Sequence, residues 1–411
     1  MPSSPRRRAC ILRRCEHYEN IVRSGAEALA GAGIDVEVIC MREAGSPRRA
    51  VVNGVTVLRA PGKLGRGLAG KALGYGLFFL FAAGRVSVQH IRRPYAVVQA
   101  NSLPDFLVFA ALVPKLLGCP VVVYLQEPAP ELAETILGQN WITGFLARVE
   151  QWAIRFADHT VTVTDQLKQR YVERGAAADR ITVVLNCPDP STVLGNVNRP
   201  SSPVRAESEF VIVCHGTIED RYGQDTIIDA ARILRDEMPD LRVVITGQGS
   251  RADKLMRDIV NYNLPDVVRF EGFVSETRLI EILNSADVGI VAQKASPYSH
   301  LVHTNKMTDY WIFGLPVIAT RLHAVSELYD DRFIEYFEPG NAADLAAVIR
   351  RLRADPGRRA ELARNGKLAQ GTNGWATQRG AYLGVFDSLL GNVAIRSGQT
   401  STSDLSDIGS S

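Results

Sequence analysis

The stretch "NKMTDYWIFGLPVIAT", residues 305–320, combines side chains that could bind an anionic ligand. Its pattern predicts a helix that begins at Asn305 and Lys306, ends at Gly314 and is followed by a short apolar strand. A helix N-terminus offers free N–H donors and partial positive charge to a phosphate, and Lys306 adds a full charge. Asp309, one turn further in, can accept hydrogen bonds from a vicinal diol. The alternative is that Asp309 only places a favourable negative charge in the first helical turn.

A second candidate is Arg221, which follows "HGTIED" in a predicted loop and directly precedes Tyr222, Gly223 and a predicted helix. A guanidinium in that place could bind two phosphate oxygens as a fork, although a surface arginine is the simpler interpretation. Gly216 and Gly247 end predicted strands, where a ligand requires close approach of the backbone. Glycines at strand ends are also ordinary turn residues.

Length and composition favour an enzyme of two or three domains. The chain has 411 residues, of which 46% are hydrophobic and 22% charged, so neither a disordered chain nor a membrane-spanning bundle is indicated. Six cysteines are scattered without a CxxC pair, which predicts reduced thiols and no structural zinc. The start, "MPSSPRRRACILRRCEHYEN", lacks the apolar region of a signal peptide, and we expect a cytoplasmic protein.

Apolar strands alternate with helical patterns along the whole chain, which predicts parallel sheets with helices on both faces. The pattern runs to about residue 190, is interrupted by a polar stretch rich in Pro and Ser, and then begins again. We therefore predict an α/β protein with two doubly wound, Rossmann-like domains that face a central cleft. The predicted divisions are a first domain at 1–194, a linker at 195–208, a second domain at 209–375, a helix at 376–394 that crosses back to the first domain, and a disordered tail at 395–411.

Charge is distributed unevenly. Residues 1–93 hold 16 Lys/Arg and 6 Asp/Glu, a net charge of +10, whereas the whole chain carries +3. The apolar run at 74–86 looks too short to cross a bilayer but long enough for a helix on a membrane surface; a packed core helix is the alternative. The basic segment could be a solvated face or could dock on anionic lipid. No nucleic-acid motif accompanies the charge, so we expect no nucleic-acid partner.

The motifs, taken in order, resemble the GT-B retaining glycosyltransferases of family 4, in particular bacterial members that build cell-surface polysaccharides. In the first half the resemblance rests on "NSLPDFLVFAALVPKLLG", "YLQEPAPEL" and "ADHTVTVTDQL". In the second half it rests on "HGTIEDRYGQDTIIDAARIL", "ITGQG", "RFEGFV", "ADVGIV" and the stretch at 305–320. It implies a GT-B fold and a nucleotide-sugar donor held by the second domain.

The resemblance also implies roles for single residues. Asp309 would bind the ribose hydroxyls, and the start of its helix would face the diphosphate. Catalysis would depend on cations at the leaving phosphates, without a protein nucleophile, metal or other cofactor. The residues concerned are, for catalysis, Arg221 and Lys306; for the donor, Gly216, Thr217, Gly247, Phe273, Val274, Asn305, Lys306 and Asp309; and for the acceptor, Asn101, Gln126 and Glu127.

Several positions depart from the family pattern. An Arg that often follows the first glycine of the second domain is Thr217, and the first acid of the family's paired-glutamate motif falls at Leu301, between His300 and His303. In the first domain, an Asp and a His of the usual motif are Leu125 and Gln126. Gln126 can hydrogen-bond a sugar hydroxyl but cannot act as an acid or base. Glu131, like Glu127, could orient the acceptor or cap a helix.

Three functions are compatible with the sequence. The first is a retaining glycosyltransferase that moves a sugar from a nucleotide donor to a lipid-linked or polysaccharide acceptor. The second is a degenerate relative that binds nucleotide or a partner enzyme without turnover. The third, a sugar-nucleotide epimerase on the same fold, is disfavoured because the match includes the helix motif of the transferases. Hydrolysis of the donor without acceptor would separate the first from the second.

Overall fold

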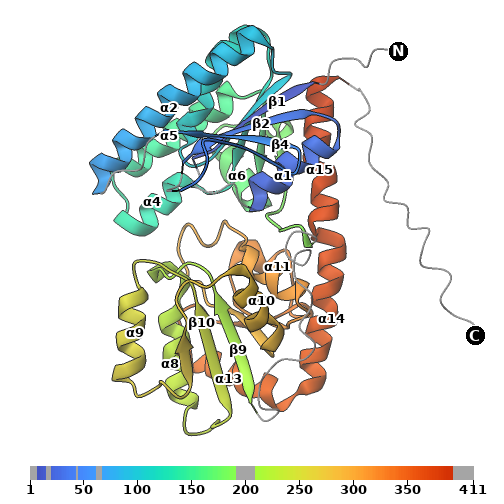
Figure 1. Ribbon diagram of the computed structural model, residues 1–411. Coiled ribbons are helices and arrows are strands. Elements are labelled where there is room, and N and C mark those ends of the chain that lie inside the picture. The colour runs from blue at the N-terminus through green and yellow to red at the C-terminus, as the bar shows by residue number, and fades with distance from the viewer. Residues whose placement is uncertain (1–6, 15–19, 43–44, 62–66, 191–208, 392–411) are drawn as a thin grey trace, which may run out of the picture.

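The computed structural model describes residues 7–14, 20–42, 45–61, 67–190 and 209–391. The predicted linker at 195–208 and the predicted tail at 395–411 lie outside these residues. Two α/β units are stacked one above the other, with long helices running along one side of both (Figure 1).

The first domain is built on an eight-stranded sheet with the order β3-β4-β2-β1-β5-β6-β7-β8. All neighbouring strands are parallel except β3 and β4, which form a hairpin through Asn53 and Gly54. Both turn residues have positive φ, as this tight turn requires. The strands are β1 (Arg8–Leu12), β2 (Asp35–Met41), β3 (Arg49–Val52), β4 (Val55–Ala60), β5 (Val97–Asn101), β6 (Val121–Leu125), β7 (His159–Thr162) and β8 (Ile181–Val183).

Helices cover both faces of this sheet. The crossover from β1 to β2 runs in one direction along the sheet, and the crossovers after β4 run in the other. Right-handed connections therefore place α1 on one face and α2, α3 and α5 on the opposite face. The helical segments are α1 (Asn20–Gly31), α2 (Gly67–Arg92), η1 (Asp105–Ala111), α3 (Leu112–Leu116), α4 (Ala129–Leu137), α5 (Trp141–Phe156), α6 (Asp165–Glu173) and η2 (Ala178–Arg180).

The second domain has a six-stranded, fully parallel sheet with the order β11-β10-β9-β12-β13-β14. Its central strand β9 is buried along its whole length, as parallel strands between two helical layers are. The strands are β9 (Phe210–His215), β10 (Leu241–Thr246), β11 (Val268–Phe270), β12 (Val288–Val291), β13 (Val317–Thr320) and β14 (Ile334–Phe337). The helices are η3 (Asp220–Tyr222), α8 (Gln224–Leu234), α9 (Ala252–Asn261), α10 (Glu276–Ser285), α11 (Asn305–Ile312), α12 (His323–Ser326), α13 (Ala342–Ala354), α14 (Pro356–Asn373) and α15 (Trp375–Leu390). The predicted fold class, two doubly wound domains, is confirmed.

Helix α2 is longer than the sequence suggested. It runs for 26 residues, and its part at Ala72–Arg92 is long and apolar enough to cross a membrane by length and composition alone. The prediction from the apolar run at 74–86, that this element is too short to cross a bilayer, was therefore wrong about its length. Small and neutral residues extend the helix beyond that run. Its inner side is fully buried in the first domain through Phe78, Ala82 and Val86, so α2 is an integral part of that domain.

The last helix joins the end of the chain to the first domain. After α14, which packs in the second domain, α15 crosses over and lies against α1 and β8 (Figure 1, right-hand side). Its Tyr382 hydroxyl donates to Gln99 Oε1 at 2.8 Å inside the first domain, and Gln378 Oε1 accepts from the Leu185 N–H at 2.8 Å.

Replacing Tyr382 with phenylalanine should lower the free energy of unfolding by about 1–2 kcal/mol, because Gln99 would lose a buried hydrogen-bond partner. Urea denaturation of the whole chain measures this change. Tyr262→Phe, which alters a partly exposed tyrosine of the second domain, is the control and should leave the stability unchanged. Equal stability of both variants and the parent would show that the Tyr382 contact does not fasten α15.

Candidate active site

A cleft of about 610 Å³ lies between the two domains, where the carboxyl ends of their parallel strands meet. Loops after β5 and β6 line one wall, and the loop after β9 with the start of α11 lines the other. The side chains on its walls include Arg13, Arg14, Ser102, Gln126, Glu127, Asn186, His215, Gly216, Thr217, Tyr222, Phe273, Gln293, Tyr298, His303, Asn305, Lys306 and Asp309.

The N-terminus of α11 opens directly into this cleft. Thr304 is the residue that precedes the helix, and its side chain makes no capping hydrogen bond to the first turn. The free N–H groups of that turn and the Lys306 ammonium therefore face the same space, which favours an anion there.

Gly216 has a precise steric role beside Lys306. The residue has φ of +108°, and a Cβ built on it would lie 2.7 Å from Lys306 Cε, so only glycine leaves room for the lysine side chain. Gly247, with φ of +143°, packs against Gly216 in turn, since its Cβ would lie 1.7 Å from the Gly216 carbonyl oxygen. Gly216 lines the cleft, whereas Gly247 serves packing behind it rather than the ligand contact that the sequence suggested.

Lys306 and Arg221 both lie against the ring of Tyr222. Lys306 Nζ is 4.2 Å from the ring centroid and Arg221 Cζ is 4.8 Å from it. Arg221 nevertheless lines a neighbouring hollow rather than the cleft, and its buried Nε has no hydrogen-bond partner among the described residues. Of the two predicted phosphate ligands, Lys306 is thus in the cleft and Arg221 is at its border.

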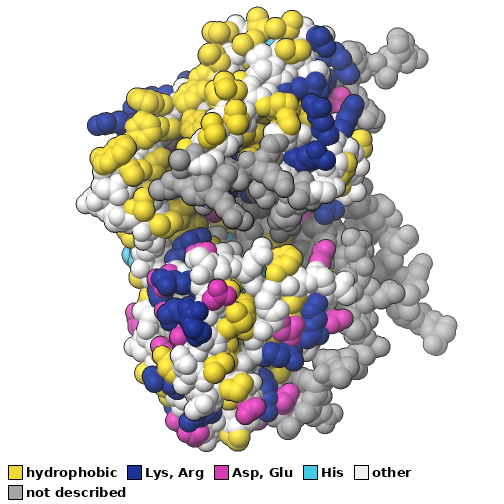
Figure 2. All heavy atoms as spheres, turned by 60° about the vertical axis from the view of Figure 1, so that its left-hand side comes forward, with side chains coloured by type: hydrophobic (Ala, Val, Ile, Leu, Met, Phe, Trp, Pro, Cys, Tyr) yellow, Lys and Arg dark blue, Asp and Glu magenta, His cyan; other side chains and the backbone are white. Residues whose placement is uncertain are grey.

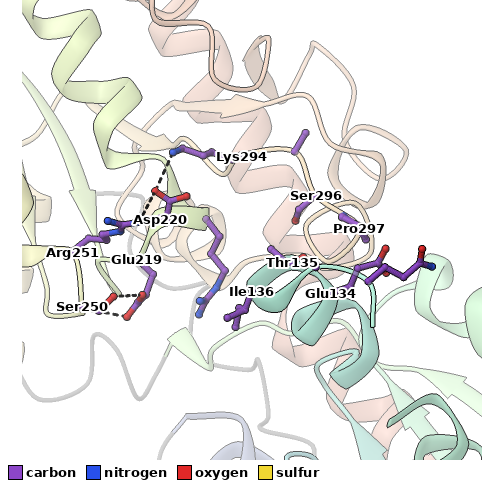
Figure 3. A pocket seen from close by; sticks show the side chains of 14 residues that line it. Glu134, Thr135, Ile136, Glu219, Asp220, Ser250, Arg251, Lys294, Ser296 and Pro297 are labelled. Carbon is purple, nitrogen blue, oxygen red and sulfur yellow. Dashed lines mark hydrogen bonds and ion pairs between the residues drawn. The ribbon is translucent and has the colours of Figure 1, made fainter. Parts of the chain in front are cut away.

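The neighbouring hollow, of about 800 Å³, lies between α4 of the first domain and loops of the second (Figure 3). Its charged groups are largely paired with each other: Lys294 lies 3.4 Å from Asp220 and Arg251 lies 3.5 Å from Asp220, while Glu219 accepts from Ser250. Because opposite charges neutralise one another here, the hollow has no excess of cations for a phosphate.

Asp309 and His215 meet deep in the cleft, with His215 Nε2 3.6 Å from Asp309 Oδ2. Burial lowers the pKa of His215 to about 3, helped by the positive charge of Lys306, so the ring is neutral and the contact is not an ion pair. Burial raises the pKa of Asp309 to about 7, although Lys306 opposes that shift. Burial also lowers the pKa of Lys306. Asp309 can therefore exchange a proton near neutral pH.

Several buried polar atoms on the cleft walls have no hydrogen-bond partner among the described residues. They are Gln126 Nε2, Asn186 Oδ1, His215 Nε2, Gln293 Oε1, both ring nitrogens of His303, and Asn305 Oδ1. Buried polar groups in folded proteins are nearly always satisfied, so a cluster of such atoms around a cavity fits a site that holds water or a polar ligand. Burial also lowers the pKa of His303 to about 4, which leaves this ring neutral.

On the first-domain wall, Gln126 and Glu127 lie in the cleft as the sequence suggested. Arg13 donates to Gln126 Oε1 at 3.0 Å and thereby leaves the amide nitrogen directed elsewhere. Asn101 is different: it is buried, accepts a hydrogen bond from Gln99 at 2.9 Å, and is not part of the wall. The following residue Ser102 takes its place at the surface of the cleft.

Glu131 neither faces the acceptor side nor caps α4. The carboxylate is buried and contacts Arg174, whose other nitrogen binds Glu150 at 2.9 Å. This ion-pair network joins α4, α5 and the end of α6, and its role is structural.

Of the remaining residues named from the sequence, some line the cleft and others are buried behind its wall. Thr217 and the exposed Phe273 line it, whereas Val274 packs into the hydrophobic cluster of the second domain. Leu301 is buried, and its carbonyl accepts from the Thr164 hydroxyl at 2.6 Å across the domain boundary. Leu301, at the position where the family pattern has an acid, therefore forms a contact between the two domains.

Sequence reasoning missed His215, Tyr222, Gln293 and Tyr298 as parts of the wall. His215 ends β9 directly before Gly216, so its position at the carboxyl end of a central strand was a usable signal. His303 was noted only as a polar neighbour of Leu301. Gln293 and Tyr298 belong to the long loop after β12, and no local pattern shows where such a loop folds.

Two protein families match consecutive parts of the chain. Residues 18–187 match the family model described as "Glycosyl transferase 4-like domain", and residues 198–369 match "Glycosyl transferases group 1". The boundary between the two matches coincides with the boundary between the two sheets.

Among curated proteins, the chain is 25% identical over 234 residues to a glycogen synthase of Mycobacterium tuberculosis, covering 55% of this chain and 54% of that protein. It is 26% identical over 258 residues to a D-inositol 3-phosphate glycosyltransferase of Nocardiopsis dassonvillei, with 58% of each chain covered. The chain thus spans little more than half the length of these relatives.

Among solved structures, a sucrose-phosphate synthase from Thermosynechococcus elongatus superposes with a TM-score of 0.72 at 16% identity, covering 93% of this chain and 99% of that one. HepE of Anabaena in complex with UDP-glucose gives a TM-score of 0.68 at 16% identity, covering 93% and 99%. With its two matched domains and this fold, the chain belongs to the GT-B glycosyltransferases.

Proposed function

We propose that the protein is a retaining glycosyltransferase that binds a nucleotide-diphosphate sugar in the cleft. The observation behind this proposal is the set of unpartnered polar atoms around the start of α11. The helix N-terminus and Lys306 suit a diphosphate, Asp309 suits the ribose diol, and His303, Gln293 and Gln126 suit sugar hydroxyls. HepE, which shares the fold, has been solved with UDP and with UDP-glucose.

The proposed reaction is driven by the departing nucleoside diphosphate. The bond between the anomeric carbon and the phosphate oxygen breaks, the sugar acquires oxocarbenium character, and negative charge grows on the phosphate. Lys306 and the α11 N-terminus stabilise that charge inside the cleft, and Arg221 does so from the border of the cleft. An acceptor hydroxyl attacks the same face, its oxygen bonds to the anomeric carbon, and its proton passes to the leaving phosphate oxygen. No protein nucleophile takes part.

The proposed acceptor is a lipid-linked sugar or a polysaccharide, bound against Gln126 and Glu127 on the first-domain wall. Glu127 lines the same cleft as Tyr222 and Tyr298 of the second domain, so the acceptor wall lies opposite the donor side. A cytoplasmic site of action fits a nucleotide-sugar donor. We further propose that no divalent metal is required, because Lys306, Arg221 and the helix N-terminus supply the positive charge; chelation by EDTA should leave the rate unchanged.

A panel of nucleotide sugars tested by thermal shift, followed by assays of donor hydrolysis and transfer, tests this function. A donor that binds only the folded protein raises its melting temperature, and an active enzyme also hydrolyses that donor slowly without acceptor. Binding without hydrolysis or transfer would favour a catalytically degenerate relative instead, for which the glutamine at position 126 is the observation in support. Recovery of an isomerised nucleotide sugar would favour an epimerase.

Asp309→Ala is expected to weaken donor binding by about 1–3 kcal/mol, the scale of a lost hydrogen-bond partner at a buried site. The fold should persist, because Asp309 makes no hydrogen bond through its side chain to the described residues. Calorimetric titration with the nucleotide sugar selected by the panel provides the measurement. The same affinity in parent and variant would remove Asp309 from the donor site.

A further inference from the structure

Helix α2 exposes an entirely apolar stripe on the side that faces away from the sheet. Leu73, Leu77, Leu80, Val88 and Ile91 follow one another at helical spacing, and each is between 45% and 67% exposed. The opposite side of the same helix is buried, and the helix contains no acidic residue. A surface helix normally carries polar residues on its outer side, so a helix whose outer stripe is apolar needs a second apolar environment.

Helix α5 also has an exposed stripe, made of aromatic and arginine side chains. Trp141, Phe145, Arg148, Trp152 and Arg155 occur at intervals of four, three, four and three residues and form one exposed stripe. Trp141 is 79% exposed. The only acidic residue of α5, Glu150, is buried against Arg174 on the other side. Tryptophan and arginine are the residues that favour the boundary between lipid headgroups and acyl chains.

The two stripes belong to one surface. Both helices cover the same face of the first sheet, and η1 lies between them in contact with each. The end of α3 adds Leu116 and Leu117, which are 77% and 60% exposed. Figure 2 shows hydrophobic side chains spread across this side of the first domain, whereas acidic and basic side chains are interspersed over the second domain. We call the stripes of α2 and α5, with Leu116 and Leu117, the docking face.

We propose that the docking face binds the surface of an anionic lipid bilayer, with α2 and α5 lying in the plane of the interface. Charge supports lipid as the occupant: the cations at the docking face are Arg148 and Arg155 on α5 and Arg92 at the end of α2, and all three are exposed. Lys115 of α3 is paired with Asp158, beyond the end of α5, at 2.8 Å. Neither stripe carries an acidic side chain. A protein partner of ordinary composition would meet basic and acidic residues around an apolar centre, whereas an anionic bilayer matches apolar stripes whose charged side chains are arginines.

The inference goes beyond the proposed activity and needs no turnover. It does specify how a lipid-linked acceptor would reach the enzyme, because the same domain supplies the acceptor wall of the cleft. The test measures lipid binding alone, so its failure would leave glycosyl transfer to a soluble acceptor unaffected.

Vesicles of phosphatidylglycerol and phosphatidylcholine, mixed with the whole chain, provide the test by sedimentation. We expect sedimentation with the anionic vesicles, partly reduced by salt, and little with vesicles of phosphatidylcholine alone. The paired substitutions Leu77→Ser with Leu80→Ser, and Trp141→Ser with Phe145→Ser, should each weaken binding about tenfold or more. Met256→Ser with Val260→Ser, which alters exposed apolar residues of α9, is the matched control and should bind as the parent does.

Fluorescence identifies the face that touches the lipid. The chain has four tryptophans, of which Trp311 and Trp375 are buried and Trp141 and Trp152 are exposed on α5. Lipids brominated in their acyl chains should quench the parent and should not quench Trp141→Phe with Trp152→Phe. Absence of binding to anionic vesicles, or binding without quenching, would overturn the proposal. So would a dimer in lipid-free solution that the serine variants abolish, because a second copy of the chain would then cover the docking face.

Discussion

Replacing Lys306 with alanine is expected to lower kcat for sugar transfer by about 10²–10³-fold, the loss seen when one preorganised group at a developing negative charge is removed. The donor's diphosphate is already charged when it binds, but the oxygen of the breaking bond gains further charge in the transition state. Lys306 should therefore affect kcat more than KM. Steady-state kinetics with the donor found in the thermal-shift panel, at saturating acceptor, measures both.

The environment of Lys306 explains why the effect should be large. Its side chain passes over Gly216, where no Cβ obstructs it, and its ammonium lies 4.2 Å from the Tyr222 ring centroid. Burial lowers its pKa, because an ammonium is less well solvated there than in water. Gly216→Ala should lower kcat as Lys306→Ala does. Its new methyl group would displace the Lys306 side chain, although the lysine itself is unchanged.

Lys254 offers a matched control for this experiment. It lies on α9, outside the cleft, where it pairs with Asp258 at 2.5 Å. Lys254→Ala should leave kcat and KM unchanged. If Lys306→Ala raised KM with kcat preserved, Lys306 would bind ground state and transition state equally, and the leaving-group role would be wrong.

The fold was predictable from the sequence because its signals are local and repeated. Buried parallel strands appear as short apolar runs, as in β9 and, apart from Arg242, β10, and a tight hairpin requires residues such as Asn53 and Gly54. The anion-binding part of the site was predictable for the same reason. Asn305, Lys306 and Asp309 lie within one helical turn, so their mutual positions follow from helix geometry.

Other parts of the site depend on contacts between distant segments. Asn101 and Ser102 are neighbours in sequence, but only the packing of β5 decides that Ser102 reaches the cleft and Asn101 does not. His303 and Tyr298 are placed by a long loop that packs on the first domain. The exposed stripe of α5 was not predicted from the sequence, because a Trp in a helix usually occupies a core position. Whether such a residue is exposed depends on how the rest of the domain packs.

Donor affinity is expected to rise about tenfold between about pH 6 and about pH 8, because Asp309, with its pKa raised to about 7, changes from mostly protonated to mostly ionised over that range. Only the carboxylate can accept hydrogen bonds from both hydroxyls of a ribose diol. His215, with a pKa of about 3, stays neutral throughout and does not contribute. Both phosphates of a nucleotide sugar are esterified, so the ligand does not titrate in this window.

The same shift has an opposite effect on stability. An acid whose pKa is raised from 3.8 to about 7 in the folded protein favours folding while it is protonated. That contribution is complete below the unfolded value and is lost as the pH rises through about 7. Asp309→Asn, which stays neutral, should therefore be more stable than the parent at about pH 8 and equally stable at about pH 4. Because 22% of the side chain remains exposed, we expect a gain of about 1–2 kcal/mol rather than the full value of the shift.

Calorimetric titration of the donor across the pH range, together with thermal unfolding of the protein without ligand, measures both effects. Asp309→Asn should bind the donor weakly and with an affinity independent of pH, and the protein without ligand should gain stability only on the alkaline side. These opposite changes follow from a single cause, since the carboxylate is desolvated in the empty cleft and regains hydrogen bonds from the bound ribose. A variant that kept the pH dependence of the parent would assign the titration to another group and would remove Asp309 as the ribose ligand.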